Sequence, residues 1–120
     1  MIQRFTSPAV QTAGFMLGAL IISLSTLMPL EQLPTAPGSD KLHHVLGFAF
    51  WALLCALGPK KRFTYMALFI IFWGGAIELI QPYVNRYTEW LDFYADALGV
   101  ILIIMARLLI ERFLESKLKV

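Results

Sequence analysis

The stretch FTSPAVQTAGFMLGALIISLSTLMPL, residues 5–30, contains no charged side chain. A bilayer core about 30 Å thick is crossed by a helix of about 20 apolar residues, so this stretch predicts a membrane-spanning helix. Pro8 and Pro29 stand near its two ends, where they do not interrupt a helix. Gly14 and Gly18 form a G-x-x-x-G pair, a pattern that favours close packing of a second helix.

The composition of the whole chain also indicates a membrane protein. Apolar residues make up 58% of the 120 residues and charged residues 15%, against roughly 45–50% and about 25% in soluble domains. Such a chain has too little polar surface to cover a core in water. The single cysteine, Cys55, excludes an intrachain disulfide. No basic patch with interleaved aromatic residues points to nucleic acid as a partner.

Three further apolar segments follow the first, and we predict spans at about 9–29, 42–58, 63–81 and 90–110. The segments are separated by PLEQLPTAPGSD, GPKKR and QPYVNRYT, which carry five of the six prolines. We therefore expect one domain over residues 1–120, an all-α integral membrane four-helix bundle. The charged tail from Arg107 onward is expected to leave the bilayer as an amphipathic extension.

The distribution of basic residues predicts the orientation, because Lys and Arg are retained on the cytoplasmic side of membrane proteins. If the four spans alternate in direction, eight of the ten Lys and Arg residues lie on one side of the membrane, and only Lys41 and Arg86 lie on the other. We therefore expect both termini to be cytoplasmic, in a multi-pass protein of the cell (inner) membrane. The eight are Arg4, Lys60, Lys61, Arg62, Arg107, Arg112, Lys117 and Lys119.

Most acids gather at the opposite, outer end, together with both histidines; they are Glu31, Asp40, Glu78, Glu89, Asp92 and Asp96. With a rise of 1.5 Å per residue, His44, Glu78 and Asp96 are each expected roughly 5–10 Å below the outer helix ends. Ionisable groups at such depth usually face the bundle interior and pair with one another. The expected partner of Glu78 is His44 or Lys41.

These positions predict an outward-facing polar pocket walled by the second, third and fourth spans, with the first span as a packing helix. Simpler roles remain open for single residues: Asp40 as a helix N-cap, Asp92 as a complement to the helix dipole, and Glu78 with Asp96 as a structural pair. His43 is interpreted as an interfacial or lipid-side neighbour of His44, and Glu89 as a solvated acid of the first helical turn. The predicted ligand-binding residues are Lys41, His44, Glu78, Gln81, Arg86, Asp92 and Asp96.

Two blocks of the sequence resemble a known family. DKLHH followed by Phe48 resembles the D-K-x-x-H-x-x-x-F signature of VanZ-like membrane proteins, and IELIQPYVNRYTEWLDFYADALG resembles their second block, E-x-x-Q, an arginine, then D-x-x-x-N-x-x-G. The blocks cover residues 40–48 and 75–99. Asp96 stands where the family pattern has asparagine. The matching positions are Asp40, Lys41, His44, Phe48, Glu78, Gln81, Arg86, Asp92, Asp96 and Gly99.

The resemblance implies a four-helix membrane protein of the cell envelope and does not imply a reaction. The founding member of the family is associated with resistance to teicoplanin, a glycopeptide directed at cell-wall precursors. The first hypothesis is therefore a protein that binds or modulates a membrane lipid, a lipid-linked cell-wall precursor or an amphiphilic glycopeptide.

Two other functions remain open. A membrane-embedded enzyme acting on a lipid headgroup would use Asp40 and His44 as an orienter–base pair and Glu78 as an acid. A proton-coupled transporter would use the same groups as a relay. We assign no cofactor and no metal, although His44 with Glu78, Asp92 or Asp96 is an open metal alternative. The sequence does not predict an oligomeric state.

Overall fold

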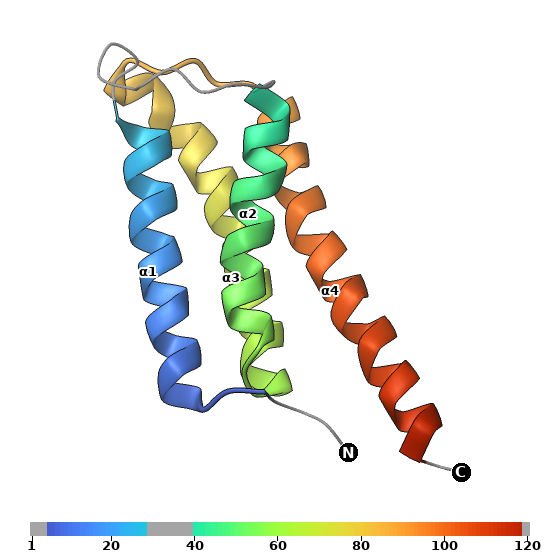
Figure 1. Cartoon of the computed structure of the whole chain (residues 1–120). Helices are drawn as coiled ribbons and strands as arrows, with labels where there is room; N and C mark the ends of the chain where they lie inside the picture. Colours follow the sequence, from blue (N-terminus) through green and yellow to red (C-terminus); the bar gives the residue numbers. More distant parts are fainter. Residues whose placement is uncertain (1–4, 29–39, 119–120) are drawn as a thin grey trace.

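The computed structural model describes residues 5–28 and 40–118, and it is helical throughout its regular elements. The helices lie side by side and alternate in direction, so α1 and α3 end where α2 and α4 begin (Figure 1). We call this end of the bundle the site end. The elements are α1 (Pro8–Leu27), α2 (Asp40–Ala56), α3 (Lys60–Ile80), the short 3-10 helix η2 (Gln81–Val84) and α4 (Trp90–Leu118).

Some of the sequence-based expectations concern residues that the structure does not describe. The proline-rich loop expected between the first two spans falls almost entirely within residues 29–39. Arg4, Glu31 and Lys119, which entered the argument on orientation, also lie outside the described residues.

Three helices are long and apolar enough to cross a membrane: Pro8–Leu27, Lys60–Val84 and Trp90–Leu118. The remaining helix, α2, has 17 residues, at the lower end of the range of about 17–25 for a spanning helix. The four expected segments are therefore confirmed as helices, with boundaries that differ by a few residues except at the end of α4. There the helix continues without a break to Leu118.

The residues that begin and end the helices follow known local preferences. Pro8 is the first residue of α1, and the Ser7 hydroxyl caps the helix by accepting a hydrogen bond from the Val10 amide at 3.2 Å. Gly58 and Pro59 separate α2 from α3. Asn85 ends η2 in the left-handed conformation, with φ 59°, which asparagine adopts more readily than most residues.

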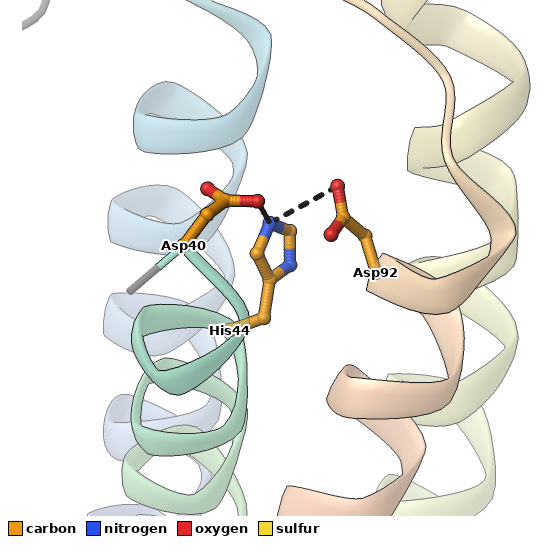
Figure 2. A group of neighbouring side chains, drawn as sticks. All are labelled: Asp40, His44 and Asp92. Atoms are coloured by element: carbon orange, nitrogen blue, oxygen red, sulfur yellow. Dashed lines mark ion pairs between the residues drawn. The ribbon is translucent and has the colours of Figure 1, made fainter. Parts of the chain in front are cut away.

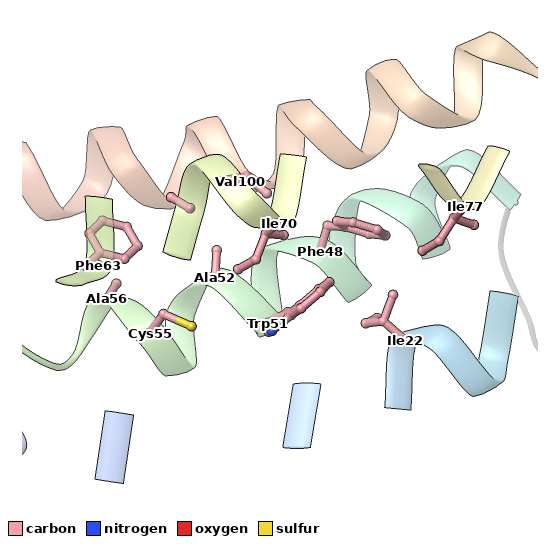
Figure 3. Close-up of a cluster of buried hydrophobic side chains, with 11 residues drawn as sticks. Ile22, Phe48, Trp51, Ala52, Cys55, Ala56, Phe63, Ile70, Ile77 and Val100 are labelled. Atoms are coloured by element: carbon pink, nitrogen blue, oxygen red, sulfur yellow. The ribbon is translucent and has the colours of Figure 1, made fainter. Parts of the chain in front are cut away.

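The apolar core follows the length of α2, which packs against all three other helices (Figure 3). Phe48 and Trp51 of α2 meet Ile70 and Ile77 of α3 and Val100 of α4, and all five are at most 1% exposed. Large apolar side chains such as Leu, Ile and Phe also cover the outer surfaces of the helices. An apolar exterior around an apolar core suits a lipid solvent.

Glycines set the closest helix contacts. A Cβ at Gly14 would lie 3.0 Å from the Leu54 Cβ, and a Cβ at Gly18 would overlap the Trp51 indole, so the predicted G-x-x-x-G packing is confirmed between α1 and α2. A Cβ at Gly99 would overlap the Val45 carbonyl oxygen, because α4 crosses the α2 backbone at this point.

The end of the bundle opposite the site end contains a buried polar network. Arg107 is only 5% exposed and donates hydrogen bonds to the carbonyl oxygens of Ala56 and Gly58, each at 2.7 Å. Its Nε also bonds Glu111 at 3.2 Å. Arg107 and Glu111, at the beginning of the expected amphipathic extension, are thus buried against the end of α2, and α4 continues past them to Leu118. The guanidinium satisfies carbonyls at the end of α2 that no turn of that helix can satisfy.

Candidate functional site

Three helices bring His44, Glu78 and Asp96 together at the site end, as their depths in the sequence predicted. His44 comes from α2, Glu78 from α3 and Asp96 from α4. Their exposed fractions are 8%, 0% and 1%. One nitrogen or oxygen atom from each lies within 4.8 Å of the other two. We call these three residues the buried triad.

The His44 ring is held between carboxylates on both of its nitrogens. Nδ1 lies 2.7 Å from Asp96 Oδ1, a hydrogen bond within the buried triad. Nε2 faces the other way, 3.6 Å from Asp92 and 3.7 Å from Asp40 (Figure 2). The predicted orienter of His44 was Asp40, but the closer carboxylate is Asp96. Asp40 is 63% exposed in its side chain, so it makes a weaker contact with the ring.

A second group of charges covers the triad on the solvent side. The Lys41 amine lies 2.6 Å from Glu89 and 2.8 Å from Asp92, and it is 3.7 Å from Asp40. We call these four residues the rim group. Lys41 therefore pairs with the rim acids and not with Glu78, which was one of its two expected partners. Hydrogen bonds to Asp92 and to Glu89 hold the pKa of Lys41 above its ordinary value.

Glu78 also joins α3 to the beginning of α4. Its Oε2 accepts a hydrogen bond from the Glu89 backbone amide at 3.1 Å, immediately before α4. The Thr88 hydroxyl donates to the Glu78 carbonyl oxygen at 2.7 Å. An anionic acceptor at a helix N-terminus is stabilised by the helix dipole and by unpaired amides. Glu78 thus has a structural contact through Oε2, while Oε1 has no hydrogen-bond partner among the described residues.

Gln81 and Arg86, both predicted to bind a ligand, contact the end of α1. Gln81 Nε2 donates to the Thr26 carbonyl oxygen at 3.0 Å. Arg86 Nη1 donates to the carbonyl oxygens of Ser25, Thr26 and Met28 at 2.9 to 3.1 Å. These bonds satisfy the carbonyls that every helix leaves unpaired at its C-terminus. The two side chains therefore attach the α3–α4 connection to α1.

A cavity of about 350 Å³ opens between α1 and α2 at the site end. Its apolar wall includes Ile22 and Phe48, and its polar wall includes His44 and Arg86. The expected pocket was walled by the second, third and fourth spans, with α1 only packing. The charged triad does lie among those three helices, but α1 forms one side of this cavity. The lining residues are Ile21, Ile22, Ser25, Thr26, Asp40, His43, His44, Gly47, Phe48 and Arg86.

His43, which the sequence predicts to be an interfacial or lipid-side neighbour of His44, also lines the cavity. It is exposed and lies on the cavity wall beside His44. A helix places adjacent residues about 100° apart, so one helix can direct His44 to the triad and still present His43 to the cavity. No signal in the sequence indicates this position, because the approach of α1 cannot be deduced from residue spacing within α2.

The site therefore joins two chemical environments. On one side of His44 lies a buried pair of carboxylates, and on the other lies an apolar cavity with an arginine at its polar end. Such a site can accommodate an amphiphilic molecule, hold a proton on a histidine, or bind a cation between carboxylates. No protein-family model matches the chain, and no curated protein or solved structure matches it either.

Proposed function

We propose that the chain is a VanZ-like inner-membrane protein of the cell envelope, and that it binds or modulates an amphiphilic envelope molecule. The ligand class comprises envelope lipids, lipid-linked cell-wall precursors and amphiphilic glycopeptides. The observation that carries the proposal is the cavity of about 350 Å³ between α1 and α2. Binding pockets of small ligands have this size and combine apolar walls with a few fixed polar groups.

The cavity matches an amphiphile in both of its parts. Ile21, Ile22 and Phe48 suit an acyl or polyprenyl chain, because their contacts are apolar. Arg86 and His43 suit a phosphate or sugar headgroup, because they offer hydrogen-bond donors at the other end. Arg86 is already fixed by three carbonyl contacts, so its guanidinium is held in place before a ligand arrives.

The proposal places the site end on the extracytoplasmic side and both termini in the cytoplasm. The support is the excess of Lys and Arg at the opposite end of the bundle, which includes Lys60, Lys61, Arg62 and Arg107. A cysteine-accessibility experiment in whole cells tests this orientation directly. A cysteine at Tyr83, which is 88% exposed, is expected to react with an impermeant maleimide from outside.

Filling the cavity is expected to reduce ligand capture. Gly47 lines the cavity, and the nearest atom to a Cβ there is the flexible end of Ile22 at 3.2 Å, so Gly47→Leu would place a side chain in the cavity. We expect photo-cross-linking to a polyprenyl-phosphate disaccharide, a phospholipid or a lipoglycopeptide to fall roughly tenfold or more, about 1.4 kcal/mol in binding. Mass spectrometry of the cross-linked peptides measures the effect.

The matched control is Leu46→Phe, which enlarges a side chain on the same helix that is 57% exposed and outside the cavity. It is expected to leave cross-linking unchanged. Equal capture of all three probes by Gly47→Leu and by the unsubstituted protein would contradict the proposal, provided that both proteins elute as the same folded species.

A second candidate function, a membrane-embedded enzyme acting on a lipid headgroup, is favoured by the contacts of His44. A buried carboxylate on Nδ1 orients the ring, and Nε2 remains directed toward the rim, an arrangement suited to a general base. If the protein is an enzyme, His44→Gln is expected to abolish release of phosphate from a polyprenyl pyrophosphate. Absence of turnover by the unsubstituted protein would exclude this reaction.

A further inference from the structure

The buried triad holds two carboxylates that have unused oxygens. Asp96 Oδ2 and Glu78 Oε1 are buried and have no hydrogen-bond partner among the described residues. A buried polar atom without a partner is unfavourable by about 1–3 kcal/mol, and more when it is charged. Native structures usually provide a partner for such atoms, from protein, water or an ion.

The charges within the triad are also unbalanced. Glu78 and Asp96 carry two negative charges when ionised, and His44 supplies at most one positive charge. Lys41, the nearest lysine along α2, is already paired with Asp92 and Glu89 in the rim group. Two buried carboxylates with one neutral imidazole would be balanced by a single divalent cation.

The positions of the ligand atoms are close to those of a metal site. Imidazole nitrogen and carboxylate oxygen bind first-row metals at about 2.0–2.2 Å, so neighbouring ligand atoms lie about 3–3.5 Å apart. In the triad, one atom from each residue lies within 4.8 Å of the others. The ligand atoms would move closer by rotation of the Glu78 and Asp96 side chains toward a common centre.

The surroundings of His44 supply an independent observation. A histidine that binds a metal through one nitrogen usually donates its other ring N–H to a carboxylate, which fixes the tautomer. His44 directs Nδ1 into the triad, while Nε2 lies 3.6 Å from Asp92 and 3.7 Å from Asp40 (Figure 2). The same ring thus faces the ligand cluster on one side and two carboxylates on the other.

We propose that His44, Glu78 and Asp96 bind a divalent transition-metal ion, with Asp92 and Asp40 orienting the His44 ring from its Nε2 side. Imidazole with two carboxylates suits Zn²⁺, Mn²⁺ or Fe²⁺, whereas Ca²⁺ takes six to eight oxygens. The ion lies one side chain away from the cavity, because His44 belongs to both. The alternative set of Asp40, His44 and Asp92 is less suitable, because Asp40 is exposed and Asp92 is paired with Lys41.

Zinc binding to the purified, full-length protein tests this assignment. After removal of metal in detergent micelles, titration with Zn²⁺ followed by calorimetry and elemental analysis is expected to give one ion per chain. Glu78→Gln and Asp96→Asn keep the side-chain shape and remove a ligand charge. Each is expected to weaken Zn²⁺ binding by more than roughly 100-fold. Asp92 contacts the ion only through the His44 ring, so Asp92→Asn is expected to weaken Zn²⁺ binding by roughly 10–100-fold.

Glu89→Gln is the matched control, because Glu89 is an exposed acid of the same end that pairs with Lys41. It is expected to bind Zn²⁺ as the unsubstituted protein does. X-ray absorption of the zinc-loaded unsubstituted protein is expected to show one nitrogen and two carboxylate ligands, a readout that does not depend on how the variants fold.

Substoichiometric binding, or binding that survives in the Glu78→Gln, Asp96→Asn double variant, would overturn the assignment. The two carboxylates would then share a proton instead of a metal ion. The outcome is separable from the proposed function, because cross-linking to amphiphiles is measured in the cavity and Gly47→Leu leaves the three ligand residues in place.

Discussion

Gly99→Ala is expected to lower the free energy of unfolding by about 3 kcal/mol, at the upper end of the usual range for overpacked sites. The added Cβ would overlap the Val45 carbonyl oxygen and would lie 2.9 Å from the Ala49 backbone nitrogen. These are backbone atoms of α2, so no side-chain rotation can relieve the contact. The helices α2 and α4 would have to separate. Titration with SDS in mixed micelles, followed by circular dichroism, measures the change.

Gly75→Ala is the control for this experiment. A Cβ at Gly75 would lie 3.4 Å from the Phe93 ring, an ordinary van der Waals contact. Because alanine is the better helix former by about 1 kcal/mol, this variant is expected to be as stable as the unsubstituted protein or more stable. Equal stability of the Gly99 and Gly75 variants would contradict the close crossing of α2 and α4.

Arg107→Met is expected to destabilise the fold by about 3–5 kcal/mol, the range for breaking one partner of a buried ion pair. The substitution leaves the Ala56 and Gly58 carbonyls without their Arg107 donor and leaves the Glu111 carboxylate buried, with the Lys60 amine at 3.4 Å. Arg112→Met, which removes an exposed arginine from the same helix, is expected to change stability by less than about 0.5 kcal/mol. The same SDS titration provides the measurement.

A double variant separates the two effects of Arg107. Arg107→Met with Glu111→Leu removes the uncompensated carboxylate, so part of the lost stability is expected to return. The carbonyls of Ala56 and Gly58 would remain without donors, so recovery is expected to be incomplete. Full recovery would mean that the carbonyl bonds contribute nothing, and no recovery would mean that Glu111 is not buried.

The grouping of His44, Glu78 and Asp96 was predictable from the sequence because a membrane limits the alternatives. Depth follows from counting residues along each helix, and groups at one depth that cannot face lipid must face one another. The helices themselves were predictable for the same reason, since long apolar segments between proline-containing breaks have few other structures in a bilayer.

The partners of Lys41, Gln81 and Arg86 were not predictable in this way. Each stands near a helix end, where a polar side chain can meet solvent, a ligand or an unpaired carbonyl, and spacing within one helix does not distinguish these. The role of α1 was not predictable either, because it depends on contacts between helices that are far apart in the sequence. Its polar residue Gln11 is fully buried and donates hydrogen bonds to Cys55 and Pro59, contacts that join positions 44 and 48 residues apart.

The burial of Arg107 and Glu111 was missed for a related reason. Their i,i+4 spacing is compatible with the ion pair in the structure, but charges at the end of an apolar segment resemble a solvated tail. The decisive feature is the end of α2, which presents carbonyl oxygens at the same level as Arg107. The end of α2 and the Arg107 region of α4 meet only through the arrangement of the helices.

The long-range helix caps have a consequence for biosynthesis. The last carbonyls of α1 are satisfied by side chains 55 to 61 residues later in the chain, and those that end α2 by a side chain 49 to 51 residues later. During translation, the first two helices are therefore made before the side chains that cap them. Until those side chains appear, solvent or lipid headgroups must satisfy the carbonyls at these helix ends. The connection between α3 and α4 then completes α1, and the fourth helix completes α2.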